Sequence, residues 1–285
     1  MFDLAGLEDA QRVVARAMPP TPQYRWPGLC RRTGCEVWVK HENHTPTGAF
    51  KVRGGLVLLD ELARAGKLPR RMVTATRGNH GQSVPFAAVP RGVIVSVFAP
   101  KGNSVEKNAA MVGWGAELIE FGSDYDEARL EAVRYAESKG AVYVPPFHPA
   151  LVRGVATYAL EFFTAVPDLD VVYVPIGMGS GICGLIGTRD LFGLKTDIVG
   201  VVATQAPAMA RSFAAGRVVE TNAADTFADG MACRMPMDEA LDIVRRGAAR
   251  VIEVDEASIA EAMRVLYRAQ GQQRREERRD GWLGR

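Results

Sequence analysis

A lysine lies at the point where a helix is expected to begin. Pro46 and Gly48 precede a helical pattern, and Lys51 falls in its first turn. The helix macrodipole disfavours a positive charge at this end, and burial disfavours it further. Both effects lower the pKa of an amine, which makes Lys51 a candidate nucleophile for Schiff-base formation with a carbonyl compound. For an isolated lysine, a solvated surface position is the more common alternative.

A second candidate is a short turn between an expected strand and an expected helix, which reads Thr76-Arg77-Gly78-Asn79-His80. Such a turn directs several backbone N–H groups at one point and can bind a carboxylate. The side-chain amide of Asn79 can also donate to an oxygen on a planar ring. Glycine and asparagine are equally common in ordinary turns, where they adopt positive φ angles. The stretch therefore fits either an anion site or an ordinary turn.

The third candidate is a glycine-rich loop, again between a strand and a helix, which reads Gly177-Met178-Gly179-Ser180-Gly181. Glycines let backbone N–H groups close around a phosphate, and Ser180 adds a hydroxyl group. With Gly184 the loop also matches the dinucleotide-binding pattern GxGxxG. That pattern requires an acidic residue about 20 positions further on, where this chain has Ala203-Thr204-Gln205. A single phosphate is the better ligand, and a lysine, a ring-facing asparagine and a phosphate loop together describe a site for pyridoxal phosphate.

The elements that must position these loops form a repeating pattern. From residue 71 onward, short β-branched runs alternate with helical patterns, which is typical of parallel sheets covered by helices. The predicted strands are residues 72–75, 93–98, 117–121, 141–144, 171–176, 198–203 and 251–254. The predicted helices are residues 49–65, 82–88, 104–113, 124–138, 152–165, 182–192 and 256–268. The proline-rich stretch 144–149 predicts a domain boundary.

The composition points to a small-molecule partner. The chain has 285 residues, 47% of them hydrophobic and 24% charged, with a formal charge of +2. This balance does not favour binding to nucleic acid or to a membrane surface. No apolar run approaches the roughly 20 residues of a membrane helix, and the first residues lack the pattern of a signal peptide. We therefore expect a cytoplasmic protein with four free thiols.

In these motifs the sequence resembles the fold-type-II pyridoxal-phosphate enzymes and, within them, the threonine and serine dehydratase (ammonia-lyase) group. Residues 47–54, TGAFKVRG, resemble the lysine motif TGSFKxRG, with alanine in place of serine. Residues 78–82, GNHGQ, match the turn GNHxQ, and residues 177–181 resemble the phosphate-binding glycine loop with Met and Ser inserted. The resemblance also covers residues 113–122, 147–149 and 229–232, and it extends to about residue 269.

The resemblance implies an α/β fold of the tryptophan synthase β type. Two open, mainly parallel three-layer αβα domains would enclose the cofactor cleft between them. The small domain would comprise residues 70–146. The large domain would comprise residues 1–69 and 147–285, with an apparently incomplete C-terminus. The expected assembly is a homodimer.

The resemblance also assigns roles to the matched residues. Lys51 would hold pyridoxal 5'-phosphate as a Schiff base and remove the α-proton of the substrate, and Asn79 would hydrogen-bond the ring hydroxyl. The phosphate would be held by Gly177, Met178, Gly179, Ser180 and Gly181. The substrate would be bound by Thr76, Arg77, Gly78, Asn79 and His80. The expected reaction converts a 3-hydroxy amino acid (threonine, serine or a hydroxyaspartate-like compound) to a 2-oxo acid and ammonia.

Two alternatives accompany this interpretation. One is β-replacement of the cysteine synthase type, although those enzymes typically carry a different asparagine loop. The other is a truncated, catalytically impaired family member. Residues 270–285 are rich in charge and lack apolar periodicity, so we expect them to be solvated and poorly ordered. The resemblance implies a further helix and strand here, with a side chain for the ring nitrogen. Their absence suggests a truncated or frame-shifted C-terminus, weak cofactor retention and low activity.

Arg77 is an unusual residue for its position in the turn. In some racemising relatives a serine there is the second acid/base, a role that arginine cannot readily take because its pKa exceeds about 12. A guanidinium can instead pair with a second carboxylate on the substrate. Alternatively, Arg77 faces away and pairs with a carboxylate of the protein.

No metal site is predicted. His41 and His44 lack further ligands to complete a set and are interpreted as solvated loop residues. Asp225 and Asp229 lie where some relatives bind a cation, but loop carboxylates are more often solvated. Cys183 and Cys233 are interpreted as small buried residues.

Overall fold

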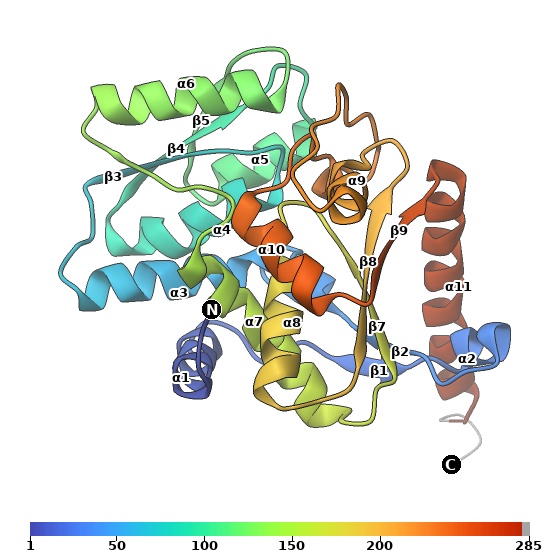
Figure 1. Ribbon diagram of the computed structural model, residues 1–285. Coiled ribbons are helices and arrows are strands. Elements are labelled where there is room, and N and C mark those ends of the chain that lie inside the picture. Colours follow the sequence, from blue (N-terminus) through green and yellow to red (C-terminus); the bar gives the residue numbers. More distant parts are fainter. Residues whose placement is uncertain (281–285) are drawn as a thin grey trace.

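The computed structural model describes the backbone of residues 1–280 and the side chains of residues 1–269. It contains two parallel sheets, as the sequence predicted (Figure 1). The first has the strand order β5-β4-β3-β6 and consists of β3 (Arg71–Ala75), β4 (Ile94–Ala99), β5 (Glu117–Glu120) and β6 (Val142–Tyr143). The second has the order β7-β8-β9 and consists of β7 (Val171–Pro175), β8 (Asp197–Ala203) and β9 (Arg250–Val254).

Helices cover both faces of the four-stranded sheet. Successive side chains of β3 point to opposite faces of the sheet. Met72 packs in one hydrophobic cluster with α3 (Lys51–Arg64) and α4 (Asn79–Ala88). Val73 packs against α6 (Tyr125–Ser138) on the other face. The remaining elements beside this sheet are α5 (Val105–Gly113) and the 3₁₀ turn η2 (Val89–Arg91). This half of the fold therefore has the expected three layers.

Helices also pack on the three-stranded sheet. Ile198 and Val202 of β8 pack with α8 (Ser180–Leu191) and α9 (Ala208–Ala215). Val171 and Tyr173, which point to the other face of β7, are 37% and 56% exposed. Both belong to the edge strand, whereas Val199 of the central strand β8, which pairs with Tyr173 on the same face, is fully buried. The same half contains α10 (Asp238–Gly247) and η3 (Asp229–Met231).

Two long helices join the halves. Helix α3 packs against α4 on one side and against α7 (Pro149–Ala165) on the other, and α7 packs in turn against α8. Helix α1 (Leu4–Ala15), which sequence reasoning missed, packs on α3 and α7. The boundaries predicted at residues 69/70 and 146/147 separate the two sheets but cut through this helical layer. The domain division itself stays a prediction.

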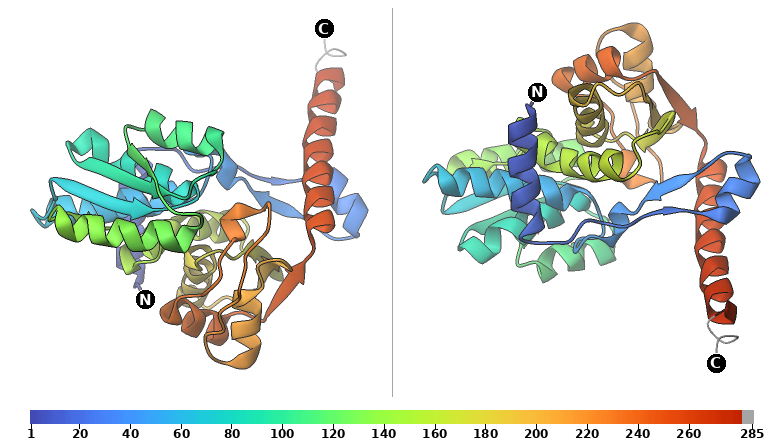
Figure 2. Two further views of the ribbon diagram at one scale, coloured as in Figure 1. Left: turned by 90° about the horizontal axis from the view of Figure 1, so that it is seen from above. Right: turned by 90° about the horizontal axis from the view of Figure 1, so that it is seen from below.

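A small antiparallel hairpin was also missed. It consists of β1 (Gln23–Arg25) and β2 (Trp38–Lys40), with α2 (Pro27–Thr33) between them and η1 (Glu42–His44) after them. Figure 2 shows α11 (Glu256–Asp280) beside α2, extending away from both sheets. Ala269 of α11 packs on Trp26 and Leu29.

The C-terminal helix is longer than predicted. It continues past residue 268 to Asp280, whereas the sequence predicted a poorly ordered end from residue 270. Two residues on its expected apolar face, Met263 and Tyr267, are 59% and 81% exposed. We also predicted that residues 270–285 are solvated, but their side chains lie outside the described residues. No helix among the described residues is long and apolar enough to cross a membrane.

Candidate active site

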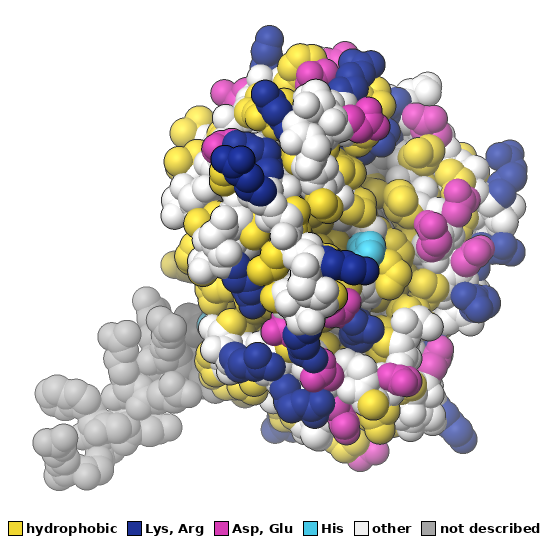
Figure 3. Space-filling model, turned by 90° about the vertical axis from the view of Figure 1, so that its left-hand side faces the viewer, with side chains coloured by type: hydrophobic (Ala, Val, Ile, Leu, Met, Phe, Trp, Pro, Cys, Tyr) yellow, Lys and Arg dark blue, Asp and Glu magenta, His cyan; other side chains and the backbone are white. Residues whose placement is uncertain are grey.

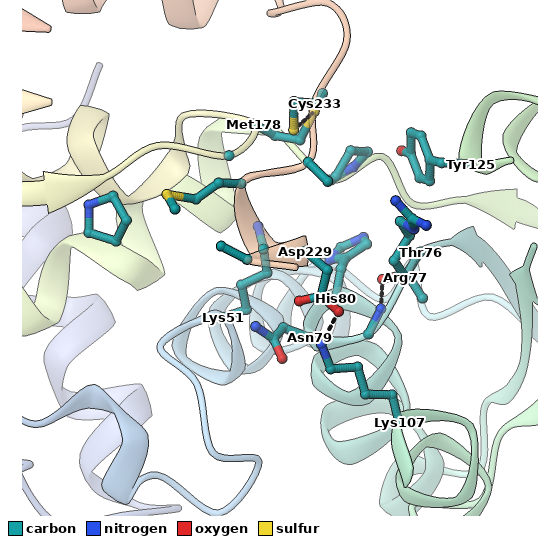
Figure 4. A pocket seen from close by; sticks show the side chains of 18 of the residues that line it. Lys51, Thr76, Arg77, Asn79, His80, Lys107, Tyr125, Met178, Asp229 and Cys233 are labelled. Atoms are coloured by element: carbon teal, nitrogen blue, oxygen red, sulfur yellow. Dashed lines mark hydrogen bonds and ion pairs between the residues drawn. The ribbon is translucent and has the colours of Figure 1, made fainter. Parts of the chain in front are cut away.

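A cavity of about 320 Å³ lies where the three sequence motifs come together. Its walls include the start of α3, the loop between β3 and α4, and the loop between β7 and α8 (Figure 4). The carboxyl ends of parallel strands lie at one edge of a sheet, and loops at that edge commonly form binding sites. The sequence patterns thus identified the three loops that line the cavity. The segment 228–233 also lines it, but only the family resemblance pointed to part of that segment.

Lys51 is the first residue of α3, as predicted. Its Nζ lies 3.3 Å from Oγ of Ser180, the first residue of α8. Burial lowers the pKa of Lys51 to about 8. The neutral amine is therefore far more populated near neutral pH than in an ordinary lysine, which favours attack on a carbonyl carbon.

The glycine-rich loop closes tightly around the start of α8. A Cβ on Gly177 would lie 2.2 Å from the carbonyl oxygen of Gly230, and a Cβ on Gly179 would lie 2.8 Å from the Cβ of Ala240. Gly179 also has a φ of +96°, which disfavours any other residue. Among the described residues, no side chain caps α8, so its first N–H groups are available to an anion. Of the predicted phosphate-binding residues, Gly177 and Met178 line the cavity, while Gly179, Ser180 and Gly181 are buried behind them.

The turn after β3 presents backbone groups to the cavity. Thr76 Oγ1 accepts a hydrogen bond from the backbone N–H of Gly78 at 2.9 Å, and Asn79 begins α4. His80 is buried, with Nε2 3.3 Å from the carbonyl oxygen of Val144. Burial and the charge of Lys51 lower the pKa of His80 to about 3, so its imidazole is neutral. Arg77 is exposed and also lines the cavity.

Four further residues of the cavity were not predicted to act there. Lys107 of α5 forms an ion pair with Asp229 of η3, which links the two halves of the fold. Tyr125, the first residue of α6, has a buried hydroxyl without a hydrogen-bond partner among the described residues. Cys233 lines the cavity, with its Sγ 3.3 Å from Sδ of Met178. The sequence analysis interpreted Cys233 only as a small buried residue and did not place it at the cavity. Burial of its thiol raises the pKa of Cys233 to about 11.

A second ionic contact crosses between the halves close to the cavity. Arg234 lies 3.5 Å from Asp124 and 3.6 Å from Asp126, at the start of α6. It also pairs with Glu220 at 3.2 Å. The segment that contains Asp229 and Cys233 is thus held to the four-stranded half at two points.

A buried ionic network fixes the helix that carries Lys51. Arg53 is fully buried; its Nε donates to Glu42 at 2.8 Å and its Nη1 to Glu161 at 2.7 Å. Lys40 donates to the same carboxylate of Glu161 at 2.6 Å. These contacts join the first turn of α3 to α7, to η1 and to the hairpin. Sequence reasoning assigned no function to them.

The histidine interpretation needs one correction. His41 is only 3% exposed, and its Nε2 accepts a hydrogen bond from Trp26 at 2.9 Å, so it is a buried structural residue. His44 is exposed, as expected. Within residues 1–269, no group of three or more His, Cys, Asp or Glu side chains could hold a metal ion.

Figure 3 shows basic and acidic side chains interspersed on one face of the molecule.

Comparison with known proteins gives consistent matches. Residues 14–273 match the family model described as "Pyridoxal-phosphate dependent enzyme". The chain is 32% identical to the L-threonine ammonia-lyase of Thermotoga maritima over 93% of this chain and 66% of that protein. It is 35% identical to the L-threonine ammonia-lyase of Geobacter sulfurreducens over 82% of this chain and 58% of that protein. The chain thus spans less than two thirds of the length of either relative.

A solved structure is also similar to this chain. It is described as the processed form of threonine deaminase isoform 2 from Solanum lycopersicum, and it matches with a TM-score of 0.84 and 25% identity, over 94% of this chain and 80% of that one.

Proposed function

The chain belongs to the family of pyridoxal-phosphate dependent enzymes, and from this premise we propose that it is a dehydratase (ammonia-lyase). Its substrate is a 3-hydroxy amino acid (threonine, serine or a hydroxyaspartate-like compound), and its products are a 2-oxo acid and ammonia. One observation carries the proposal: the Lys51 amine, with a pKa lowered to about 8, lies 3.3 Å from the hydroxyl that begins α8. The names of the relatives, L-threonine ammonia-lyases, support the same activity.

The residues of the cavity fit pyridoxal phosphate. The cofactor has an aldehyde, a ring hydroxyl and a phosphate, and each has a suitable partner. Lys51 offers the amine for the aldehyde, and Asn79 offers an amide for the ring hydroxyl. The uncapped start of α8, with the Ser180 hydroxyl and the crowded Gly177, suits a phosphate.

In the proposed mechanism each protein group has a defined task. When bound, pyridoxal phosphate takes up the negative charge that develops on the substrate α-carbon. Lys51 Nζ removes and holds the α-proton, because its lowered pKa suits a general base near neutral pH. The backbone N–H groups of residues 76–80 hold the α-carboxylate and orient the substrate.

The test has two parts. The purified chain, mixed with pyridoxal phosphate, should develop an imine absorbance band, and borohydride should then fix the label on the peptide that contains Lys51. A label on Lys40 or Lys67 would contradict the assignment. The labelled site should disappear in Lys51→Ala.

Activity is measured as released 2-oxo acid and ammonia, with and without added thiol. Release that is independent of thiol supports the dehydratase. A thioether product formed only with thiol would instead indicate β-replacement. An imine band without either product would indicate an impaired relative.

The proposal also covers the organisation of the protein. It includes a homodimer, a cytoplasmic location, and a small domain of residues 70–146 beside a large domain of residues 1–69 and 147–285. Light scattering on the purified chain tests the dimer, and limited proteolysis at residues 144–149 tests the domain boundary.

A further inference from the structure

We infer that Arg77 binds a second carboxylate on the β-carbon of the substrate, so that the preferred substrates are acidic 3-hydroxy amino acids such as 3-hydroxyaspartate. This inference rests on the proposed dehydratase function and specifies its substrate class. In the reaction the Cα–H and Cβ–O bonds break and water leaves. Hydrolysis of the resulting enamine then takes up water and gives oxaloacetate and ammonia.

Among the described side chains that line the cavity, one positive charge has no ion-pair partner and no assigned role. The charged side chains that line it are Lys51, Arg77, Lys107 and Asp229. Lys107 is neutralised by Asp229, and Lys51 is assigned to the cofactor. Among the described residues, no carboxylate lies within ion-pair distance of Arg77. The alternative raised by the sequence, pairing of Arg77 with a carboxylate of the protein, is therefore not found there.

The position of Arg77 suits a group beyond the reacting carbons. Arg77 belongs to the turn whose N–H groups are proposed to hold the α-carboxylate. In Figure 4 its side chain extends away from Lys51, toward the side of the cavity that carries Tyr125. A planar guanidinium can bind a carboxylate through two parallel hydrogen bonds. The methyl group of threonine offers it nothing comparable.

The decisive experiment compares two substrates that differ in one group. L-Threonine and 3-hydroxyaspartate share the α-amino acid and the 3-hydroxyl, and carry a methyl or a carboxylate on the β-carbon. The holoenzyme is assayed with each, and the ratio of kcat/KM for hydroxyaspartate over threonine is determined. We expect a ratio above about 10, because hydrogen bonds to charged groups are the stronger ones. A ratio below one would overturn the inference.

Variants assign the effect to particular groups. Arg77→Ala should lower the ratio by about tenfold or more, and Arg77→Lys by less, because a lysine keeps the charge but loses the fork of donors. Arg70→Ala removes an exposed arginine outside the cavity and is the control, with an unchanged ratio. An unchanged ratio in Arg77→Ala would refute the role of Arg77.

A binding measurement separates this inference from the proposed function. Malonate, a small dicarboxylate, is titrated into the holoenzyme and into Arg77→Ala by calorimetry. If neither substrate releases ammonia, the proposed function fails, but about tenfold weaker malonate binding in Arg77→Ala would still support the carboxylate site. Equal malonate binding to both proteins would overturn it.

Discussion

The Lys51 ammonium group loses its proton near pH 8, because burial lowers its pKa from the ordinary value of 10.5 to about 8. Only the neutral amine attacks an aldehyde. The rate of imine formation with pyridoxal phosphate should therefore rise about tenfold per pH unit below 8 and level off above it. Stopped-flow absorbance measures this rate. Free N-acetyl-lysine is the control and should keep rising toward its own, unshifted pKa; the same continued rise in the protein would contradict a lowered pKa.

Single residues of the site differ in how far the sequence could predict them. Lys51 and Asn79 are identifiable because each lies in a local pattern, a helix start or a turn after a strand. The pairing of Lys107 with Asp229 joins residues 122 positions apart, and no local pattern encodes such a contact. The sequence likewise could not show that the buried Tyr125 hydroxyl has no hydrogen-bond partner among the described residues, because its neighbours are set by the fold.

At the scale of the elements, the glycine-rich loop after β7 tolerates little change. A side chain at Gly177 would meet the carbonyl oxygen of Gly230 at 2.2 Å, so Gly177→Ala must displace the backbone that forms the cavity wall. We expect its Kd for pyridoxal phosphate to rise by about tenfold or more, since bound anions depend on the position of backbone N–H groups. Fluorescence titration measures the Kd. Gly113→Ala, where a Cβ meets nothing within 4 Å, is the control.

The helix that carries Lys51 depends on its ionic network for stability. Glu161→Gln removes a carboxylate that pairs with both Arg53 and Lys40, and leaves buried positive charge uncompensated. The free energy of unfolding should fall by about 3–5 kcal/mol, as measured by urea denaturation. Glu131→Gln breaks only a surface pair with Arg134 and should cost less than about 1 kcal/mol. Equal effects of the two variants would show that the network does not stabilise the fold.

The elements themselves were predictable where burial imposes a clear pattern. Strands β3 and β8 are almost continuous runs of buried apolar residues, and the sequence predicted both within one residue at each end. The hairpin of β1 and β2 was missed because each strand has three residues, too few for a periodicity to emerge. Helix α11 was predicted too short because its continuation past residue 268 has no apolar pattern of its own.

At the scale of the whole molecule, the two sheets meet at the cavity and are tied together near it by charged side chains. Lys107–Asp229 and Arg234–Asp124 both join the four-stranded half to the segment 228–234. All four side chains are partly exposed, so solvent reaches the pairs. Their attraction therefore depends on the medium as well as on the fold.

These two ion pairs make access to the cavity sensitive to ionic strength. Exposed pairs of this kind contribute about 0.2–1 kcal/mol each and are screened by salt. Amide hydrogen exchange in residues 226–234 should therefore become about two- to fivefold faster between low salt and about 1 M sodium chloride, as read by mass spectrometry. Lys107→Ala should exchange faster than the unaltered chain at low salt and respond less to added salt, while peptides from the buried strand β8 stay unchanged. Salt would then control how often the segment that lines the cavity opens.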